Sequence, residues 1–203
     1  MGSLYYSASD LGRLDRAYRR TFVNRLQGVR AAVAVGSMGP DGKPNLGLFF
    51  SLQHLGASPA LMGLVFRPET DRRGTLYNLR QNGWLTANFC QEEYRETIHR
   101  TSAEFPEGVS EFKILDIAPH FEPDIPAPFV KEAPIRLALE RATEFRLPND
   151  CVFAVLNLRG VWIDELALEP ETLLPCFEGL LHINGLDAYH GVAFQKTLGY
   201  ERP

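Results

Sequence analysis

Residues 67–75 carry the densest group of side chains that could bind an anion. The segment reads Arg-Pro-Glu-Thr-Asp-Arg-Arg-Gly-Thr, and Arg67, Arg72 and Arg73 offer guanidinium donors that suit phosphate oxygens. A helix that starts at Thr75 would add a hydroxyl and unpaired backbone N–H groups at the positive end of its dipole. The alternative is an exposed loop whose arginines pair with the acidic residues of the same segment. The segment therefore predicts either a phosphate site or an ordinary charged loop.

Short strands and helices must position this segment. Apolar stretches at residues 29–37 and 43–53 flank a Gly-Pro-Asp-Gly turn and predict a β-hairpin. Apolar runs predict further strands at residues 60–66, 84–89, 135–145 and 151–164. Helices are predicted at residues 11–26, 75–81 and 91–100, the second capped by Thr75 and ended by Asn82-Gly83. The pattern predicts a mainly β protein with helical additions (α+β), in which the strands form a closed, Greek-key-like barrel.

Two segments lie outside this pattern of short strands and helices, an N-terminal extension and a proline-rich arm. Residues 1–27 predict an N-terminal helical extension, and residues 119–134 hold five prolines with little periodicity. We expect this proline-rich arm to run over the surface and to pack on a partner subunit, because long structureless loops inside compact domains are uncommon. Residues 168–177 have helix and turn features, and the C-terminal remainder reads as irregular. At 203 residues the chain suits a single domain, residues 1–203.

Composition and charge exclude several classes of function. A net charge of −4 argues against general nucleic-acid binding. Three cysteines without a C-x-x-C pair favour free thiols in a reducing compartment, and five scattered histidines predict no metal site. The N-terminus lacks a signal-peptide pattern, and no run approaches the ~20 apolar residues of a membrane helix. We therefore expect a cytoplasmic protein that binds neither membrane nor nucleic acid.

Several local motifs, in their order along the chain, resemble those of the flavin reductase-like family, whose members use an FMN-binding split barrel. The motifs are Asn45 to Ser51, Ser58-Pro59, Leu61 to Phe66, Arg73-Gly74-Thr75-Leu76, Leu85 to Phe89 and Thr101 to Phe112. The last, with its Thr-Ser-Ala-Glu-Phe-Pro-Glu-Gly run, is the most specific. Two positions depart from the family pattern, because Gly74 stands where the family usually has Asp, and Ala57 replaces an acidic residue before Ser58.

The resemblance implies an FMN site and assigns candidate residues to it. Phe49, Phe50 and Leu52 would wall the flat flavin ring, while Asn45 and Ser51 would meet its polar edge. The residues alone also fit a plain barrel strand whose alternate side chains fill the core. The same family pattern places the phosphate at the arginines and Thr75.

Three more positions are candidates on the same resemblance. Asn88 ends a strand at a place where relatives often touch the flavin region. Ser102 could reach the cofactor pocket or merely cap the preceding helix. His182 replaces an Arg of the family pattern and could contact phosphate or substrate, although a structural role is the simpler interpretation.

The resemblance further implies an FMN-binding oxidoreductase that accepts hydride from NAD(P)H and passes electrons to free flavin, a small acceptor or a partner protein. No side chain is then required as a general base, because the flavin carries the chemistry. The alternative is a non-catalytic flavin-binding electron carrier or partner subunit, which Gly74, His182 and Ala57 favour. We expect a homodimer, since a split barrel leaves apolar surface uncovered and the proline-rich arm needs a partner.

Overall fold

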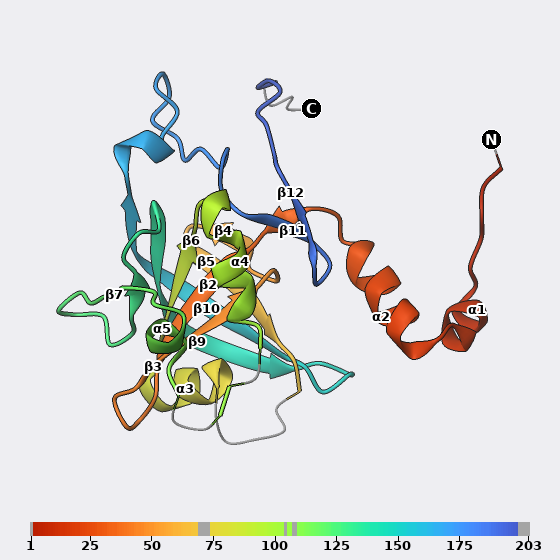
Figure 1. Ribbon diagram of the computed structural model, residues 1–203, viewed down its shortest axis with the longest axis horizontal. Helices are drawn as coiled ribbons and strands as arrows, with labels where there is room; N and C mark the ends of the chain where they lie inside the picture. Colours follow the sequence, from red (N-terminus) through yellow and green to blue (C-terminus); the bar gives the residue numbers. More distant parts are fainter. Residues whose placement is uncertain (1, 69–73, 104, 107–108, 199–203) are drawn as a thin grey trace.

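A seven-stranded antiparallel sheet forms the centre of the computed structural model, which describes residues 2–68, 74–103, 105–106 and 109–198 (Figure 1). Its strand order is β3-β2-β6-β9-β10-β5-β4. The strands are β2 (Val33–Met38), β3 (Pro44–Phe49), β4 (Gln53–Ala57), β5 (Ala60–Phe66), β6 (Trp84–Phe89), β9 (Ile135–Arg146) and β10 (Val152–Ile163). The predicted mainly β class is confirmed, and each strand predicted from an apolar run is present.

The two edge strands of this sheet, β3 and β4, are consecutive in the chain. Residues 50–52 alone connect them, so the edges lie near each other and the sheet curls back on itself. Ser51 holds this seam, because its hydroxyl donates to the Val65 carbonyl at 2.9 Å and accepts from the Val65 N–H at 3.2 Å. The result is a barrel whose seam runs beside the loop after β3.

Apolar side chains divide between an inner and an outer cluster, because alternate residues of a strand face opposite sides. Val33 and Val35 of β2 belong to the inner cluster, whereas Ala34 of β2 and Ala32 just before it belong to the outer one. Helix α3 (Thr75–Asn82) adds Leu76 and Leu79 to the inner cluster. Residues of helices α4 (Arg95–Arg100) and α5 (Glu111–Ile114) join the outer cluster and cover that face.

The predicted helices need two corrections in this part of the chain. Helix α3 ends at Gly83, whose φ of 81° is left-handed as expected, but its N-cap is Gly74 and Thr75 is its first residue. The predicted helix at residues 91–100 is divided into a 3-10 turn, η1 (Glu92–Tyr94), and α4.

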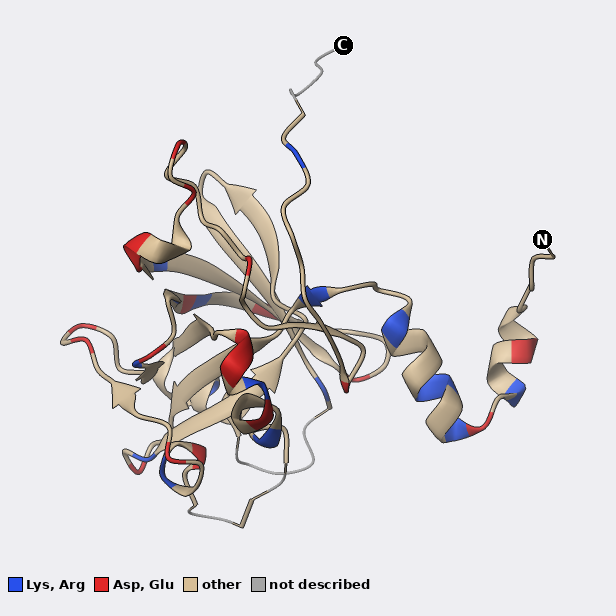
Figure 2. Cartoon of the chain, turned by 45° about the horizontal axis from the view of Figure 1, so that its top comes forward, with Lys and Arg blue, Asp and Glu red and all other residues tan. Residues whose placement is uncertain are grey.

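The N-terminal extension forms two helices rather than one. Helix α1 (Ala8–Arg13) follows a capping box between Ser7 and Asp10, and helix α2 (Arg16–Arg25) has Asp15 as its N-cap. The Asp15 carboxylate accepts two backbone N–H bonds at 3.0 Å, so it begins a new helix where the apolar period alone predicted continuity. This N-terminal arm, residues 2–27, extends away from the barrel in two views (Figure 1 and Figure 2).

Two short strands occupy the C-terminal part that the sequence pattern indicated as irregular. Strands β1 (Arg30–Ala31), β11 (His182–Asn184) and β12 (Ala188–His190) form a small antiparallel sheet. Residues 168–177 form a turn after a 3-10 helix, η2 (Glu165–Ala167), instead of a helix of their own. Strands of three residues carry too few side chains to show a period of two, which is why the pattern missed them.

The proline-rich arm packs on its own barrel. Strands β7 (Pro119–His120) and β8 (Phe129–Val130) pair with each other, and residues 127–130 are buried. The ring of Phe129 lies edge-on to Trp162 with centroids 4.9 Å apart. The prediction that this arm needs a partner subunit is therefore wrong for its second half.

Candidate cofactor site

A polar cluster lies where β3 meets the start of α3. The side-chain amide of Asn45 donates to Ser37 Oγ at 3.1 Å and to Thr75 Oγ1 at 3.2 Å. The Asn78 amide donates to the same Ser37 Oγ at 3.0 Å. Because Ser37 and Asn45 are paired residues of the β2–β3 hairpin, these bonds fix the first turn of α3 against that hairpin. We call these four side chains the rim network.

Among the described residues, no side chain caps the start of α3. Gly74 has φ 89° and ψ −175°, a conformation that glycine adopts with little strain, and α3 has no side-chain cap. Among the described residues, no atom lies within 4 Å of where a Cβ on Gly74 would stand. The first N–H groups of the helix are then available to a ligand, and the helix dipole favours a negative one. Because residue 74 is glycine, the acidic side chain of the family pattern is absent from this helix start.

An aromatic surface lies beside the rim network. Asn45, Gly47 and Phe49 alternate along β3 and share a face. A Cβ on Gly47 would lie 3.2 Å from the Phe49 ring and 3.4 Å from Thr75 Oγ1, so the ring, the strand and the helix start are close neighbours. Phe49 is half-buried and packs edge-on against Phe66 with centroids 5.4 Å apart. The arrangement combines an anion-binding helix start with an apolar, flat-sided neighbour.

The other predicted ring contacts are distributed differently. Leu52 packs against the inner cluster together with Phe49, but Phe50 packs against the outer cluster. The structure therefore brings Phe49 and Leu52 to one cluster and separates Phe50 from them. Ser51 uses its hydroxyl at the barrel seam, where it bonds to Val65.

Asn88 is sealed inside the protein. Its side chain is fully buried, and its amide donates to the Ala34 carbonyl at 2.8 Å and to Thr86 Oγ1 at 3.0 Å. Its carbonyl oxygen accepts the Val130 N–H at 2.9 Å. The Thr86 hydroxyl in turn donates to the Pro128 carbonyl. This core network gives Asn88 a structural role, and a cofactor contact would require breaking it.

The remaining predicted site residues lie apart from the rim network. His182 is buried in β11 with Nδ1 2.9 Å from the Leu180 carbonyl, and in Figure 1 β11 lies at the top of the barrel and α3 at its bottom. Ser102 is exposed and donates to the His99 carbonyl at 2.7 Å, which caps the end of α4. Arg67 is exposed just after β5. Arg72 and Arg73 lie outside the described residues.

Three residues of the site were not predicted from the sequence. Ser37 and Gly47 gave no signal, because their role depends on the hairpin register that places them beside Asn45 and Thr75. Asn78 did carry a signal. Asparagine is unfavourable inside a helix, so an asparagine at position 78, in the first turn of the predicted helix, is itself a sign of a specific side-chain hydrogen bond.

Two further features concern the described residues as a whole. No group of three or more His, Cys, Asp or Glu side chains in this part of the chain could hold a metal ion. Nor is any helix among them long and apolar enough to cross a membrane.

Comparison with known proteins identifies the family. The model of the flavin reductase like domain matches residues 26–187, whereas no curated protein sequence matches the chain. A crystal structure described as a candidate flavin reductase with a split barrel domain, from Shewanella frigidimarina NCIMB 400, is 29% identical. Its TM-score is 0.91, with 98% of this chain and 100% of that chain covered.

Two more distant structures share the fold. An FMN-binding protein from Thermus thermophilus is 22% identical with a TM-score of 0.71, covering 84% of this chain and 90% of its own. An NADH:FAD oxidoreductase from Streptomyces globisporus C-1027 is 14% identical with a TM-score of 0.71, covering 95% and 99%. The seven-stranded sheet is thus a split barrel, as the motifs predicted. The chain belongs to the flavin reductase-like family.

Proposed function

We propose that this chain is an FMN-binding oxidoreductase that takes hydride from NAD(P)H and passes electrons to free flavin, a small acceptor or a partner protein. The observation that carries the proposal is the uncapped start of α3 at Gly74, which lies beside the half-buried Phe49 ring. Membership of the family supports an oxidoreductase that handles flavin.

Each part of the site has a role in this proposal. The N–H groups at the start of α3 and the Thr75 hydroxyl bind the phosphate, and Arg72 and Arg73 add guanidinium donors. Asn45 orients Thr75 through its 3.2 Å bond, and Phe49 offers the ring an apolar face that excludes water. A bound flavin supplies the hydride-accepting chemistry itself, so the protein contributes binding, orientation and shielding.

We propose FMN rather than FAD because the site offers one compact place for a phosphate. Relatives of this fold include both an FMN-binding protein and an NADH:FAD oxidoreductase, so the fold does not decide the flavin. Mass spectrometry of the flavin released from the purified protein tests the choice. A predominance of FAD would contradict it.

Replacement of Arg73 by Ala tests the phosphate site. The loss of a charged hydrogen bond of about 1.5–3 kcal/mol predicts an FMN affinity that falls roughly ten- to a hundred-fold. Arg146→Ala is the matched control, because Arg146 is an exposed arginine of the β9–β10 hairpin. Fluorescence titration with FMN measures both, and an Arg73 variant that binds like the parent would remove the assignment.

Turnover separates the enzyme from its alternative, a flavin-binding carrier without catalysis. The holoprotein is mixed with NADH or NADPH under anaerobic conditions in a stopped-flow instrument. The enzyme requires reduction of the bound flavin to be faster than reduction of free FMN by the same nicotinamide. Equal rates would favour the carrier.

Assembly and location complete the proposal. We propose a homodimer in the cytoplasm, since the N-terminal arm extends from the barrel with no buried residue in α1 or α2. Sedimentation of the 22.8 kDa chain at micromolar concentration tests the dimer.

A further inference from the structure

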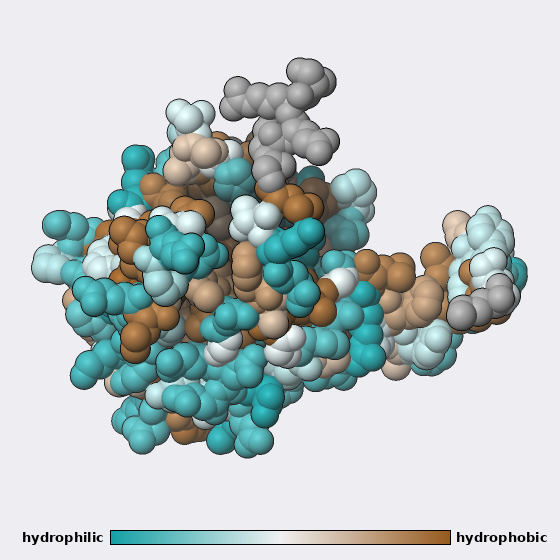
Figure 3. All heavy atoms as spheres, turned by 90° about the horizontal axis from the view of Figure 1, so that it is seen from above, coloured by the Kyte–Doolittle hydropathy of each residue, from teal (hydrophilic) through white to brown (hydrophobic). Residues whose placement is uncertain are grey.

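The N-terminal arm exposes apolar side chains that the described part of its own chain leaves uncovered. Tyr18, Val23 and Leu26 are 54%, 48% and 68% exposed. Apolar atoms of the arm are open to solvent and separate from the barrel in the space-filling view (Figure 3). An amphipathic helix gains stability by burying its apolar stripe against another surface, so α2 lacks the contact for which its sequence is suited.

The arm and the barrel carry opposite charges. Residues 1–27 contain five arginines and two aspartates, a net charge of +3, so residues 28–203 carry −7 of the chain's total of −4. Figure 2 shows basic residues along α2 and acidic residues over the loops and short helices of the barrel. Arg16, Arg20 and Val23 lie at i, i+4 and i+7, so they form one basic face with an apolar residue at its end.

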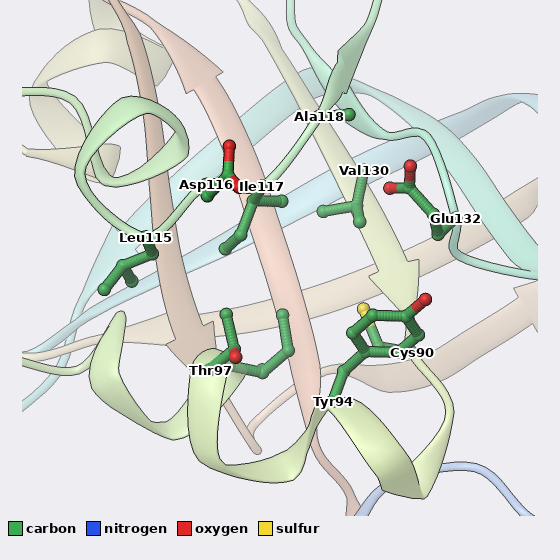
Figure 4. A pocket seen from close by; sticks show the side chains of 10 residues that line it. Cys90, Tyr94, Thr97, Leu115, Asp116, Ile117, Ala118, Val130 and Glu132 are labelled. Carbon is green, nitrogen blue, oxygen red and sulfur yellow. The ribbon is translucent and has the colours of Figure 1, made fainter.

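A cavity on the barrel has the complementary character. Its volume is about 310 Å³, and it opens between α4, α5 and β8, away from the rim network. Its floor is apolar, formed by Cys90, Ile98, Leu115, Ile117 and Val130. The carboxylates of Asp116 and Glu132 and the phenol of Tyr94 border it (Figure 4).

Glu132 stands close above this floor. Burial, with a smaller contribution from the negative charge of Glu132, raises the pKa of the Cys90 thiol to about 12. Asp116 and Glu132 are themselves exposed, so their charges are available to an incoming cation. The cavity therefore suits an apolar side chain that is accompanied by arginines.

We propose that α2 of one protomer docks, through the face of Arg16, Arg20 and Val23, on the acidic-edged cavity of a second copy of this chain. In a two-fold dimer each arm crosses to the other barrel, so the contact is made twice. Complementary charge selects the cavity, and burial of Val23 stabilises the contact. This inference deepens the proposed homodimer and is independent of the flavin chemistry.

A basic amphipathic helix can also bind an anionic membrane or a nucleic acid. Both carry dense negative charge, which the −7 barrel would repel at close range. The barrel of a second copy is equally negative, but beside its carboxylates it offers an apolar cavity, which suits Val23 next to the two arginines. The cavity and its carboxylates thus favour a second copy of this chain as the partner.

A charge exchange between full-length variants tests the contact. The arm variant is Arg16→Glu with Arg20→Glu, and the cavity variant is Asp116→Asn with Glu132→Arg. Asparagine is chosen at position 116 because the residue there has φ 53°, which asparagine tolerates. Arg146→Glu is the control, an exposed charge reversal in the β9–β10 hairpin. Circular dichroism and thermal melting verify that every variant is folded.

Sedimentation equilibrium gives the dissociation constant of each sample. We expect a rise of at least about tenfold for the arm variant and for the cavity variant, and no change for the control. An equimolar mixture of the two variants should regain association as a heterodimer, because the altered arm then meets the altered cavity and the native arm meets the native cavity.

The outcomes separate the arm contact from the dimer. A dimer that persists unchanged in both variants, or a mixture that fails to associate, contradicts the arm contact alone. A wild-type chain that is monomeric contradicts both. Binding of that monomer to phosphatidylserine vesicles or to duplex DNA, lost in the arm variant, would identify the other occupant instead.

Discussion

The core network around Asn88 and the rim network around Asn45 use the same chemistry in different surroundings. In each, an asparagine amide donates to a threonine hydroxyl, at 3.0 Å in the core network and at 3.2 Å in the rim network. Asn88 and Thr86 are fully buried, whereas Asn45 and Thr75 are half-buried. The core network joins β2, β6 and the proline-rich arm, and the rim network joins the β2–β3 hairpin to α3.

This difference in burial separates a structural role from a binding role. Each polar atom of the Asn88 side chain has a protein partner, so a ligand could bind there only by replacing one of them. In the part of the chain that the structure describes, no side chain caps the helix N–H groups beside the rim network, so a ligand there would replace no bond with a described side chain. Residue type is therefore a poor guide to a binding site unless burial and partners are known.

The largest contrast between the two networks is expected from replacing each asparagine by alanine. Asn88→Ala leaves the Val130 N–H and the Ala34 carbonyl buried without this partner, and each such group costs about 1–3 kcal/mol. We expect the free energy of unfolding to fall by about 3 kcal/mol. Asn45→Ala should lower it by about 1 kcal/mol, since water reaches the half-buried Thr75 and the buried Ser37 keeps its bond from Asn78. Urea unfolding measures both, and equal losses would remove the distinction.

Two glycines of the same hairpin sharpen the contrast. A Cβ on Gly36 would lie 2.0 Å from the Pro128 carbonyl oxygen and 2.4 Å from Thr86 Oγ1, in the core network. Gly36→Ala should therefore cost about 2 kcal/mol or more through overpacking. Gly47→Ala, next to the rim network, should cost less than about 1 kcal/mol, because the Phe49 ring at 3.2 Å can shift slightly. Thermal melting of the pair checks the order.

Flavin affinity should respond to the rim network alone. Thr75→Ala removes one hydroxyl from the helix start, and the loss of a neutral hydrogen bond of about 1 kcal/mol predicts roughly fivefold weaker FMN binding. Thr143→Ala is the matched control, because Thr143 is an exposed threonine of β9. Titration with FMN measures both affinities, and an unchanged affinity in the Thr75 variant would exclude its hydroxyl from the site.

The smallest expected effect on stability concerns Glu111, whose side chain is partly buried. Its carboxylate accepts the Leu46 N–H at 3.0 Å, and its partial burial raises the pKa above the ordinary 4.5. The folded state then binds more protons than the unfolded state, so stability falls as the pH rises above 4.5. Glu111→Gln keeps an acceptor oxygen without the charge.

The pH dependence of melting checks this prediction. The glutamine variant should match the wild type below pH 4.5 and become the more stable of the two as the pH rises. If the wild type instead became more stable than the variant as the pH rises, hydrogen bonding and not burial would control the pKa of Glu111.

Local sequence determined most of the strands and the family of this protein. The Gly-Pro-Asp-Gly turn, the apolar runs and Gly83 each act within a few residues, so their signals survive without the fold. The motif from Thr101 to Phe112 indicated the family for the same reason, and the family model confirms it.

Tertiary structure alone decided which polar residues are sealed and which border an open helix start. Asn45 and Asn88 both lie on strands of the sheet, and only the packing of the proline-rich arm over β6 buries the second. The pairing of β1 with β11 and the partnership of Ser37 with Asn78 join residues far apart in the chain. No local period encodes such contacts, because burial and partners follow from how distant segments pack together.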